Sequence, residues 1–199
     1  MATFSHLPDR NWLPASSPVA LRQAQPADAA LVAGWRREPS ARRYQPLPPS
    51  SVDEVRSLLA AQALRTVGPH LVDSVYWIVE AGDELVGRVS LYGINREHGR
   101  GEVGCLIGER HRGRGYGTAA LRALACLALT PDGVDLRRLE ATVAVDHVAS
   151  RRMVERVGFQ CEGIARSYWI VDDQLRDVAR YALLRPEWQA VSAVASDRG

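Results

Sequence analysis

The most informative stretch of the chain is Glu109-Arg110-His111-Arg112-Gly113-Arg114-Gly115-Tyr116-Gly117-Thr118-Ala119-Ala120-Leu121. It connects a short apolar strand pattern to a helix pattern through alternating glycines and arginines. Glycine lets the backbone turn tightly, so that successive main-chain N–H groups point at an anion, and the following helix adds the positive end of its dipole. Arg112 and Arg114 add full positive charge. The segment therefore predicts a phosphate-binding loop.

The spacing of the glycines excludes two common phosphate-binding loops. A P-loop requires Gly-Lys-Ser/Thr, and a dinucleotide-binding turn requires Gly-x-Gly-x-x-Gly with an acidic residue about twenty positions later. This chain has no lysine, and its glycines at 113, 115 and 117 alternate. They match Arg-x-x-Gly-x-Gly, read as Arg112, Gly115 and Gly117. An ordinary glycine-rich surface turn could have the same sequence, so the surrounding sequence pattern must distinguish it from a phosphate-binding loop.

Length and composition predict one α/β domain with a single core. The chain has 199 residues, of which 46% are hydrophobic, and a net charge of +2. The balance of 25 basic against 23 acidic residues does not indicate a dedicated nucleic-acid-binding protein. The N-terminus does not resemble a leader, and no apolar run approaches the roughly 18 residues of a membrane helix. We expect no membrane association and a cytoplasmic location.

The cysteines and histidines give no sign of a metal site. Cys105, Cys126 and Cys161 are widely spaced in apolar surroundings, which predicts core thiols in a reducing compartment rather than disulfides. The five histidines form no His-x-x-x-His pair, so we infer no metal. We expect His111 at the surface of the glycine loop near the phosphates, and His98 in a turn.

Hydrophobic periodicity and turn residues predict the order β-α-α-β-β-β-α-β-α-β-β. Ser51 and Glu54 form a capping box, and Gly158 is a helix C-cap. Four prolines predict a loop over residues 38–50. The expected strands cover residues 19–22, 75–80, 84–91, 102–107, 139–145, 160–171 and 175–184, and the expected helices cover residues 26–36, 51–66, 117–129 and 149–157.

This order, with the glycine loop between its fourth strand and third helix, resembles the GCN5-related N-acetyltransferase (GNAT) superfamily, whose pyrophosphate-binding signature is Arg-x-x-Gly-x-Gly. Residues 145–159 are similar to the second cofactor motif of that family, usually Asn-x-x-Ser followed by a helix and Gly-Phe. Residues 159–188 resemble the C-terminal hairpin and closing segment of the RimJ/RimL branch, which acetylates ribosomal-protein N-termini; the matching positions are Arg166, Tyr168, Asp177, Tyr181, Ala182, Leu183, Pro186 and Trp188. The resemblance implies a single domain over residues 19–188, with an N-terminal arm (1–18) and a C-terminal tail (189–199).

The resemblance implies acetyl-CoA as the co-substrate. The residues that match cofactor-binding positions are Cys105, Leu106, Ile107, Arg112, Gly113, Arg114, Gly115, Tyr116, Gly117, Thr118, His147 and Ser150. His147 stands where the family usually has Asn, which adds bulk and a titratable group. The tyrosine that many members carry on the following helix is absent, and Ser150 is the remaining hydroxyl.

Catalytic roles follow from the same resemblance. Main-chain groups of residues 104–107 are expected to hold the pantetheine and to polarise the thioester, and Gly104 suggests a bulge that splays this strand from the next. Glu102 is the candidate base, directly or through water, although a solvated strand-end glutamate fits the same pattern. Ser150 is the candidate acid, and it also fits a helix N-cap.

The acceptor is expected to be a primary amine, with a protein N-terminus as the first candidate. Small amines such as antibiotics, polyamines or amino acids remain alternatives, and so does a non-catalytic acyl-CoA-binding module. Trp35, Tyr44, Trp77 and Tyr168 are candidates for the acceptor pocket, but aromatic residues in such patterns also fit a core. The resemblance further allows a homodimer.

Overall fold

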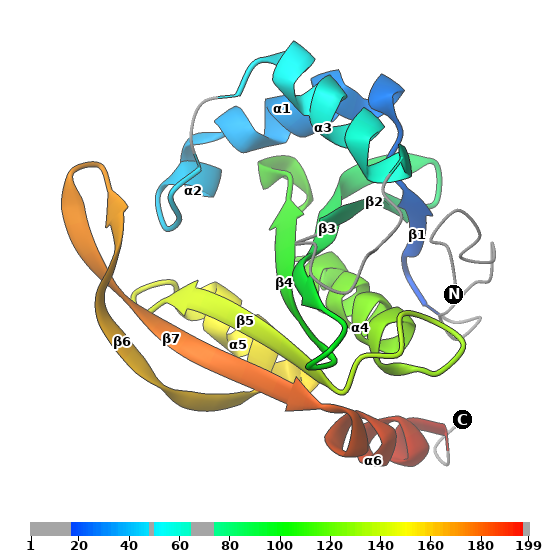
Figure 1. Cartoon of the computed structure of the whole chain (residues 1–199). Coiled ribbons are helices and arrows are strands. Elements are labelled where there is room, and N and C mark those ends of the chain that lie inside the picture. Colours follow the sequence, from blue (N-terminus) through cyan, green and yellow to red (C-terminus); the bar gives the residue numbers. More distant parts are fainter. Residues whose placement is uncertain (1–16, 48–49, 65–73, 197–199) are drawn as a thin grey trace.

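The computed structural model describes residues 17–47, 50–64 and 74–196. Its elements follow the expected order (Figure 1). The strands are β1 (Ala20–Gln23), β2 (Val75–Ala81), β3 (Glu84–Asn95), β4 (Arg100–Ile107), β5 (Arg138–Ala144), β6 (Gln160–Val171) and β7 (Gln174–Leu184). The helices are α1 (Ala29–Arg37), α2 (Pro39–Arg42), α3 (Val52–Leu64), α4 (Tyr116–Leu129), α5 (Val148–Val157) and α6 (Arg185–Ser196), with 3-10 turns at Pro26–Asp28 and Glu109–His111.

All seven strands form one sheet in the order β1-β2-β3-β4-β5-β7-β6. Every neighbouring pair is antiparallel except β4 and β5, which run parallel. That parallel pairing covers only Arg100–Glu102 against Arg138–Glu140. The two strands then diverge, and the later main-chain groups of β4 that face β5 have no strand partner among the described residues. The split is the structural basis of the candidate site.

Each face of the sheet has its own buried cluster. On one face, Val89, Leu91 and Val103 pack against the apolar side of α4, which includes Leu121 and Leu124. On the other face, residues of β2 and β4 pack under α1 and α3, so that these helices cover the face opposite α4 (Figure 1). Burial of both faces of the central strands explains their nearly continuous apolar sequences.

The predicted helix ends are confirmed. Ser51 Oγ accepts from the Glu54 amide at 3.1 Å, and the Ser51 amide donates to Glu54 Oε2 at 2.7 Å, which is the reciprocal pattern of a capping box. Gly158 ends α5 with φ +114°, a conformation that favours glycine. The expected end of the second helix, at residues 65–66, lies outside the described residues.

Two elements differ from the sequence prediction. The segment 38–50 contains the short helix α2, because Pro39 occupies a first-turn position where its missing N–H costs nothing. The expected tail instead continues α6, which starts where the Leu184 amide donates to Glu187 Oε2 at 2.8 Å and which buries Trp188 against the core. Of the expected arm, residues 1–16 and, of the tail, residues 197–199 lie outside the described residues.

The bulge expected at Gly104 lies elsewhere. Gly104 pairs regularly with Ser90, and the register shift falls between Tyr92 and Asn95 on the neighbouring strand β3. Gly104 is required by close approach instead, since a Cβ there would lie 2.6 Å from Ser90 Oγ. The splay of β4 from β5 therefore comes from the end of their pairing at Glu102, not from a bulge in β4.

Candidate active site

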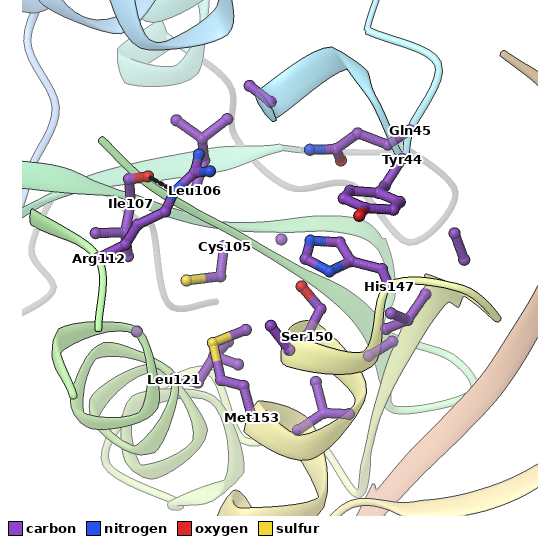
Figure 2. A pocket seen from close by; sticks show the side chains of 18 of the residues that line it. Tyr44, Gln45, Cys105, Leu106, Ile107, Arg112, Leu121, His147, Ser150 and Met153 are labelled. Carbon is purple, nitrogen blue, oxygen red and sulfur yellow. Dashed lines mark hydrogen bonds between the residues drawn. The ribbon is translucent and has the colours of Figure 1, made fainter. Parts of the chain in front are cut away.

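A cavity of about 830 Å³ opens where β4 and β5 diverge. Its walls come from the end of β4, the glycine loop with the start of α4, the end of β5 with the start of α5, and the segment that follows α2 (Figure 2). Segments far apart in the sequence thus meet at one place. Of the expected cofactor-binding residues, those in the cavity wall are Cys105, Leu106, Ile107, Arg112, Gly113, Gly115, Tyr116, Gly117, Thr118, His147 and Ser150. Arg114 is exposed outside this wall.

The glycine loop leaves a row of free donors at the start of α4. Gly113 and Gly115 have φ of +76° and +82°, which residues with side chains rarely adopt. Within the described part of the chain, the N–H groups of residues 113–118 donate to no other residue. These groups point out at the positive end of a 14-residue helix. The loop has the donors and the dipole that an anionic ligand requires.

Gly117 allows α4 to approach α5 closely at the base of the cavity. A Cβ on Gly117 would lie 2.7 Å from Met153 Sδ, so the Met153 side chain would have to move. Met153 also lines the cavity (Figure 2). The third glycine of the loop thus leaves room for the Met153 side chain between the two helices, whereas the first two are favoured by backbone conformation.

Arg112 lies across the mouth of the loop. Its Nε donates to the Ile107 carbonyl at 2.9 Å (Figure 2). Its Nη2 lies 3.8 Å from Glu38 Oε2. The arginine thus links the last residue of β4 to the segment between α1 and α2. This arrangement fixes one carbonyl at the end of β4 and keeps the guanidinium in the cavity wall.

The same segment is joined to the loop by a second set of bonds. The Ser40 amide donates to Glu109 Oε1 at 3.0 Å, the Ser40 hydroxyl donates to the same oxygen, and the Glu109 amide donates to Glu38 Oε2 at 2.9 Å. Sequence analysis did not single out Ser40 or Glu38, because nothing local marks bonds between residues about 70 positions apart.

His147, and not Ser150, is the N-cap of α5. The alternative of Ser150 as a capping residue is therefore wrong: the turn at Asp146 starts the helix earlier, and Ser150 is its third residue. Within the described residues the Ser150 hydroxyl has no hydrogen-bond partner, and the side chain lines the cavity (Figure 2). The helix is anchored by Tyr181, whose hydroxyl donates to Glu155 Oε1 at 2.8 Å and accepts from Arg151 Nε at 2.9 Å.

His147 stacks on Tyr44, with ring centroids 4.1 Å apart (Figure 2). Burial, together with nearby Arg112 and Arg43, lowers the pKa of His147 below its usual value, against an opposing effect of Asp146. The imidazole is therefore neutral at neutral pH. This contact joins the segment after α2 to the start of α5 across the cavity.

Glu102 lies beside the cavity rather than in its wall. It pairs across the strands with Tyr92, whose side chain does line the cavity. Burial is the main cause that raises the pKa of Tyr92, and the charge of Glu102 and a hydrogen bond to it raise it further. Tyr92 is therefore a neutral hydroxyl between Glu102 and the cavity. Sequence analysis missed Tyr92, although hairpin register places it opposite Glu102.

Two expectations about sulfur and histidine are corrected. His111 is buried, at 2% exposure, because the 3-10 turn directs it inward, where its Nε2 accepts from Arg110 Nε at 2.7 Å. Cys161 is exposed on the edge strand β6, whereas Cys105 and Cys126 are partly buried. Burial raises the pKa of the Cys105 thiol to about 12, so this cavity-lining thiol is protonated.

The candidate acceptor aromatics divide into two groups. Trp35 and Trp77 belong to the core, at 5% and 4% exposure. Tyr44 lines the cavity, as does Trp169, whereas its neighbour Tyr168 is exposed outside it. The described residues contain no cluster of His, Cys, Asp and Glu that could hold a metal ion. Among the described helices, none combines the length and apolar character that crossing a bilayer requires.

Comparison with known families gives a match over most of the chain. The model of the acetyltransferase (GNAT) domain matches residues 19–160. The uncharacterized N-acetyltransferase p20 of Bacillus licheniformis is 28% identical over 172 residues, which cover 85% of this chain and 94% of that protein. The ribosomal-protein-serine acetyltransferase of Escherichia coli K12 is 32% identical over 100 residues, which cover 50% of this chain and 55% of that protein.

Solved structures resemble the chain closely in fold. The spermidine N-acetyltransferase of Vibrio cholerae in complex with CoA and spermine has a TM-score of 0.77 at 22% identity, over 87% of this chain and 99% of that one. RimL, a ribosomal L7/L12 alpha-N-protein acetyltransferase in complex with CoA, has a TM-score of 0.74 at 22% identity, over 86% of this chain and 96% of that one. Together with the family match, these likenesses confirm the expected fold.

Proposed function

Because the chain belongs to the acetyltransferase (GNAT) family and is an acyltransferase, we propose that it transfers the acetyl group of acetyl-CoA to a primary amine by direct attack on the thioester. The single observation that carries the proposal is the cavity between β4 and β5. Among the described residues, main-chain groups on one of its walls have no strand partner, and the N–H groups of residues 113–118 at its end donate to no other residue. A long, thin co-substrate with a pyrophosphate suits such a cavity.

The main chain has two tasks in this proposal. The N–H groups of residues 113–118 and the start of α4 bind the pyrophosphate. The unpaired edge of β4 after Glu102 holds the pantetheine arm as an added strand would be held, and an N–H group there polarises the thioester carbonyl. Acetyl-CoA supplies an activated acyl group with a thiol as its leaving group. Both tasks need a fixed backbone, which Arg112 supports by holding the Ile107 carbonyl.

Ser150 is the proposed acid that donates a proton to the departing thiolate. Its hydroxyl lines the cavity and is free of other hydrogen bonds among the described residues, so it is available as a donor. The Cys105 thiol lines the same cavity and is protonated, because burial raises its pKa to about 12. The neutral imidazole of His147, which lines the same cavity as Ser150, adds no charge there.

Glu102 is the proposed base, acting through Tyr92. Tyr92 lines the cavity, and Glu102, its partner on the neighbouring strand, does not. The proton of the acceptor amine therefore reaches Glu102 through the Tyr92 hydroxyl or through a water. Burial keeps the Tyr92 hydroxyl protonated. A hydroxyl that relays protons must be protonated, because it gives one proton to Glu102 and takes up another from the amine. Loss of either side chain is expected to slow transfer without loss of co-substrate binding.

A protein N-terminal amine is the proposed first acceptor class, on the strength of the similarity to a ribosomal-protein-serine acetyltransferase and to the RimJ/RimL hairpin. A polyamine, the acceptor named for the structural neighbour, is less well supported. The cavity wall carries Arg43, Arg112 and Arg156 against Asp146 alone, which repels a polycation.

The test is thiol release from acetyl-CoA by the purified protein with a panel of N-terminal peptides, amino acids, polyamines and aminoglycosides, alongside calorimetric binding of acetyl-CoA. Binding with amine-dependent release supports the proposal and identifies the acceptor class. Binding without release from any amine contradicts the proposed transfer, and absence of binding contradicts the assignment of the cavity to acetyl-CoA.

A further inference from the structure

Beside the cavity lies a buried charged side chain that has no counter-ion among the described residues. Arg88, in the middle of β3, is 7% exposed. Among the described residues, its Nε has no hydrogen-bond partner, and no carboxylate oxygen lies within 4.0 Å of its guanidinium. Burial lowers the pKa of Arg88, but a guanidinium stays charged in proteins. A buried charge without a partner is costly, so its place needs an explanation.

The contacts that Arg88 does make are neutral ones. Its Nη1 donates to Ser90 Oγ at 3.2 Å, and its guanidinium lies over the ring of Tyr76, 5.3 Å from the centroid. A second guanidinium, that of Arg36, lies close enough to disfavour the charge further. The surroundings therefore hold and orient the group without neutralising it, and they leave Nε free of any hydrogen bond within the described structure.

Gly104 lines the cavity directly in front of this charge. Gly104 and Tyr92 line the cavity, and Arg88 lies directly behind them. A Cβ placed on Gly104 would stand 2.6 Å from Ser90 Oγ, 3.4 Å from Tyr92 Cε1 and 4.0 Å from Arg88 Nη1. Because Gly104 has no side chain, the hydroxyl of Ser90 and the guanidinium of Arg88 pack directly behind its main chain, next to the cavity that Gly104 and Tyr92 line.

We propose that Arg88, with Ser90, is a recognition site for a carboxylate of the acceptor, placed close to its reacting amine. The acceptor class is then an amine that carries a nearby carboxylate: a free amino acid, or a peptide with Asp or Glu next to its N-terminus. The carboxylate supplies the counter-ion that the described structure does not give Arg88. Electrostatic matching is the reason for the choice, since an arginine fork pairs well with a carboxylate and a polyamine adds more positive charge.

This inference rests on the proposed acetyl transfer and narrows its acceptor. The test uses matched pairs that differ only in charge: serine against serinamide, alanine against alaninamide, and tetrapeptides with Asp or Asn at the second position. Spermidine is included as a polycationic acceptor without a carboxylate. Thiol release from acetyl-CoA gives kcat/KM for each. A charged hydrogen bond predicts that the carboxylate member is preferred by about tenfold or more.

The variant Arg88→Met removes the charge and keeps a side chain of similar length. It is expected to fold, since an apolar residue often replaces a buried charge without loss of stability, and thermal unfolding with acetyl-CoA affinity checks this. The preference within each pair should fall to about twofold or less, and Arg88→Lys should restore part of it. The matched control is Arg137→Met, an exposed arginine bonded to the His98 carbonyl, which should keep the full preference.

The outcomes separate the two proposals. Equal rates within each pair, a preference for spermidine, or equal losses for both members in Arg88→Met overturn the carboxylate site while leaving acetyl transfer intact. If no acceptor releases thiol, acetyl transfer fails, and calorimetry of the CoA-loaded protein with N-acetylserine and N-acetylserinamide decides on the site alone. Binding of only the carboxylate, lost in Arg88→Met, then supports it, and equal or absent binding overturns it. Whether the carboxylate preference appears in the amino acid pairs or in the peptide pairs shows whether the recognised carboxylate belongs to a free amino acid or to a peptide side chain.

Discussion

The imidazole of His147 lies against the ring of Tyr44, with centroids 4.1 Å apart and ring planes at 24°. This contact places a titratable group where the family usually has an asparagine, and it closes one side of the cavity. Burial is the main reason that the pKa of His147 lies below 6.5 in the folded protein.

The stacked pair predicts a pH-dependent stability. As pH falls below 6.5, unfolded His147 takes up a proton before the folded form does, so the free energy of unfolding falls until the pH reaches the folded pKa. Above 6.5 both forms are neutral and the effect disappears. The difference in unfolding free energy between wild type and His147→Asn, measured by urea denaturation from pH 7.5 to 5, should therefore change only in the acidic range.

Tyr44→Leu is the matched control, because it removes the stacked ring while keeping an apolar side chain. The pKa of His147, followed by NMR, should rise toward 6.5 in this variant, since burial is the largest cause of its depression. A pKa at or above 6.5 in the wild type would contradict the arrangement of these two rings.

Ser150→Ala is expected to slow acetyl transfer by about 10²-fold while changing the free energy of unfolding by less than about 0.5 kcal/mol. The reason is that the hydroxyl faces the cavity and does not cap α5. Steady-state kinetics and chemical denaturation measure the two effects. Normal turnover combined with a destabilised fold would assign Ser150 to the helix instead of to the reaction.

Gly117→Ala is expected to weaken acetyl-CoA binding, because its Cβ would lie 2.7 Å from Met153 Sδ and would displace the Met153 side chain, which lines the cavity. The double variant Gly117→Ala with Met153→Ala should recover part of the affinity, since the smaller side chain removes the clash. Calorimetry on the two single variants and the double variant gives the coupling. Additive losses would show that Gly117 does not act through Met153.

Glu102→Gln and Tyr92→Phe are expected to lower kcat by similar factors, of about 10²-fold, and to lower it no further when combined, because they interrupt one proton path. Calorimetric affinity for acetyl-CoA should stay unchanged in all three variants, since neither residue belongs to the phosphate-binding loop. If Glu102→Gln lowers kcat by the expected factor and Tyr92→Phe leaves kcat unchanged, the proton path runs through water alone. Unchanged kcat in Glu102→Gln would remove Glu102 as the base.

Sequence patterns predicted the fold well where a local rule applied. The capping box at Ser51 and Glu54 and the C-cap at Gly158 each depend on neighbouring residues, and the structure confirms both. The glycine loop likewise leads directly into α4. Periodicity, turn residues and resemblance together located all seven strands within a few residues.

Prediction failed where distant residues decide the outcome. His111 is buried because of the turn that carries it and the sheet behind it, and neither is visible in a stretch rich in Gly and Arg. Ser150 has the residue type of an N-cap, but the turn at Asp146 sets an earlier helix start. Arg88 gives no signal in a strand pattern, since the lack of a counter-ion among the described residues becomes evident only once the strands and helices around it are packed.

Amine-dependent release of thiol from acetyl-CoA, followed in wild type against the panel of amines, tests the central claim most directly. The account predicts saturable release that requires both the protein and a primary amine, with the acetylated amine as the second product. Release that no amine accelerates, by a protein that still binds acetyl-CoA, would contradict it.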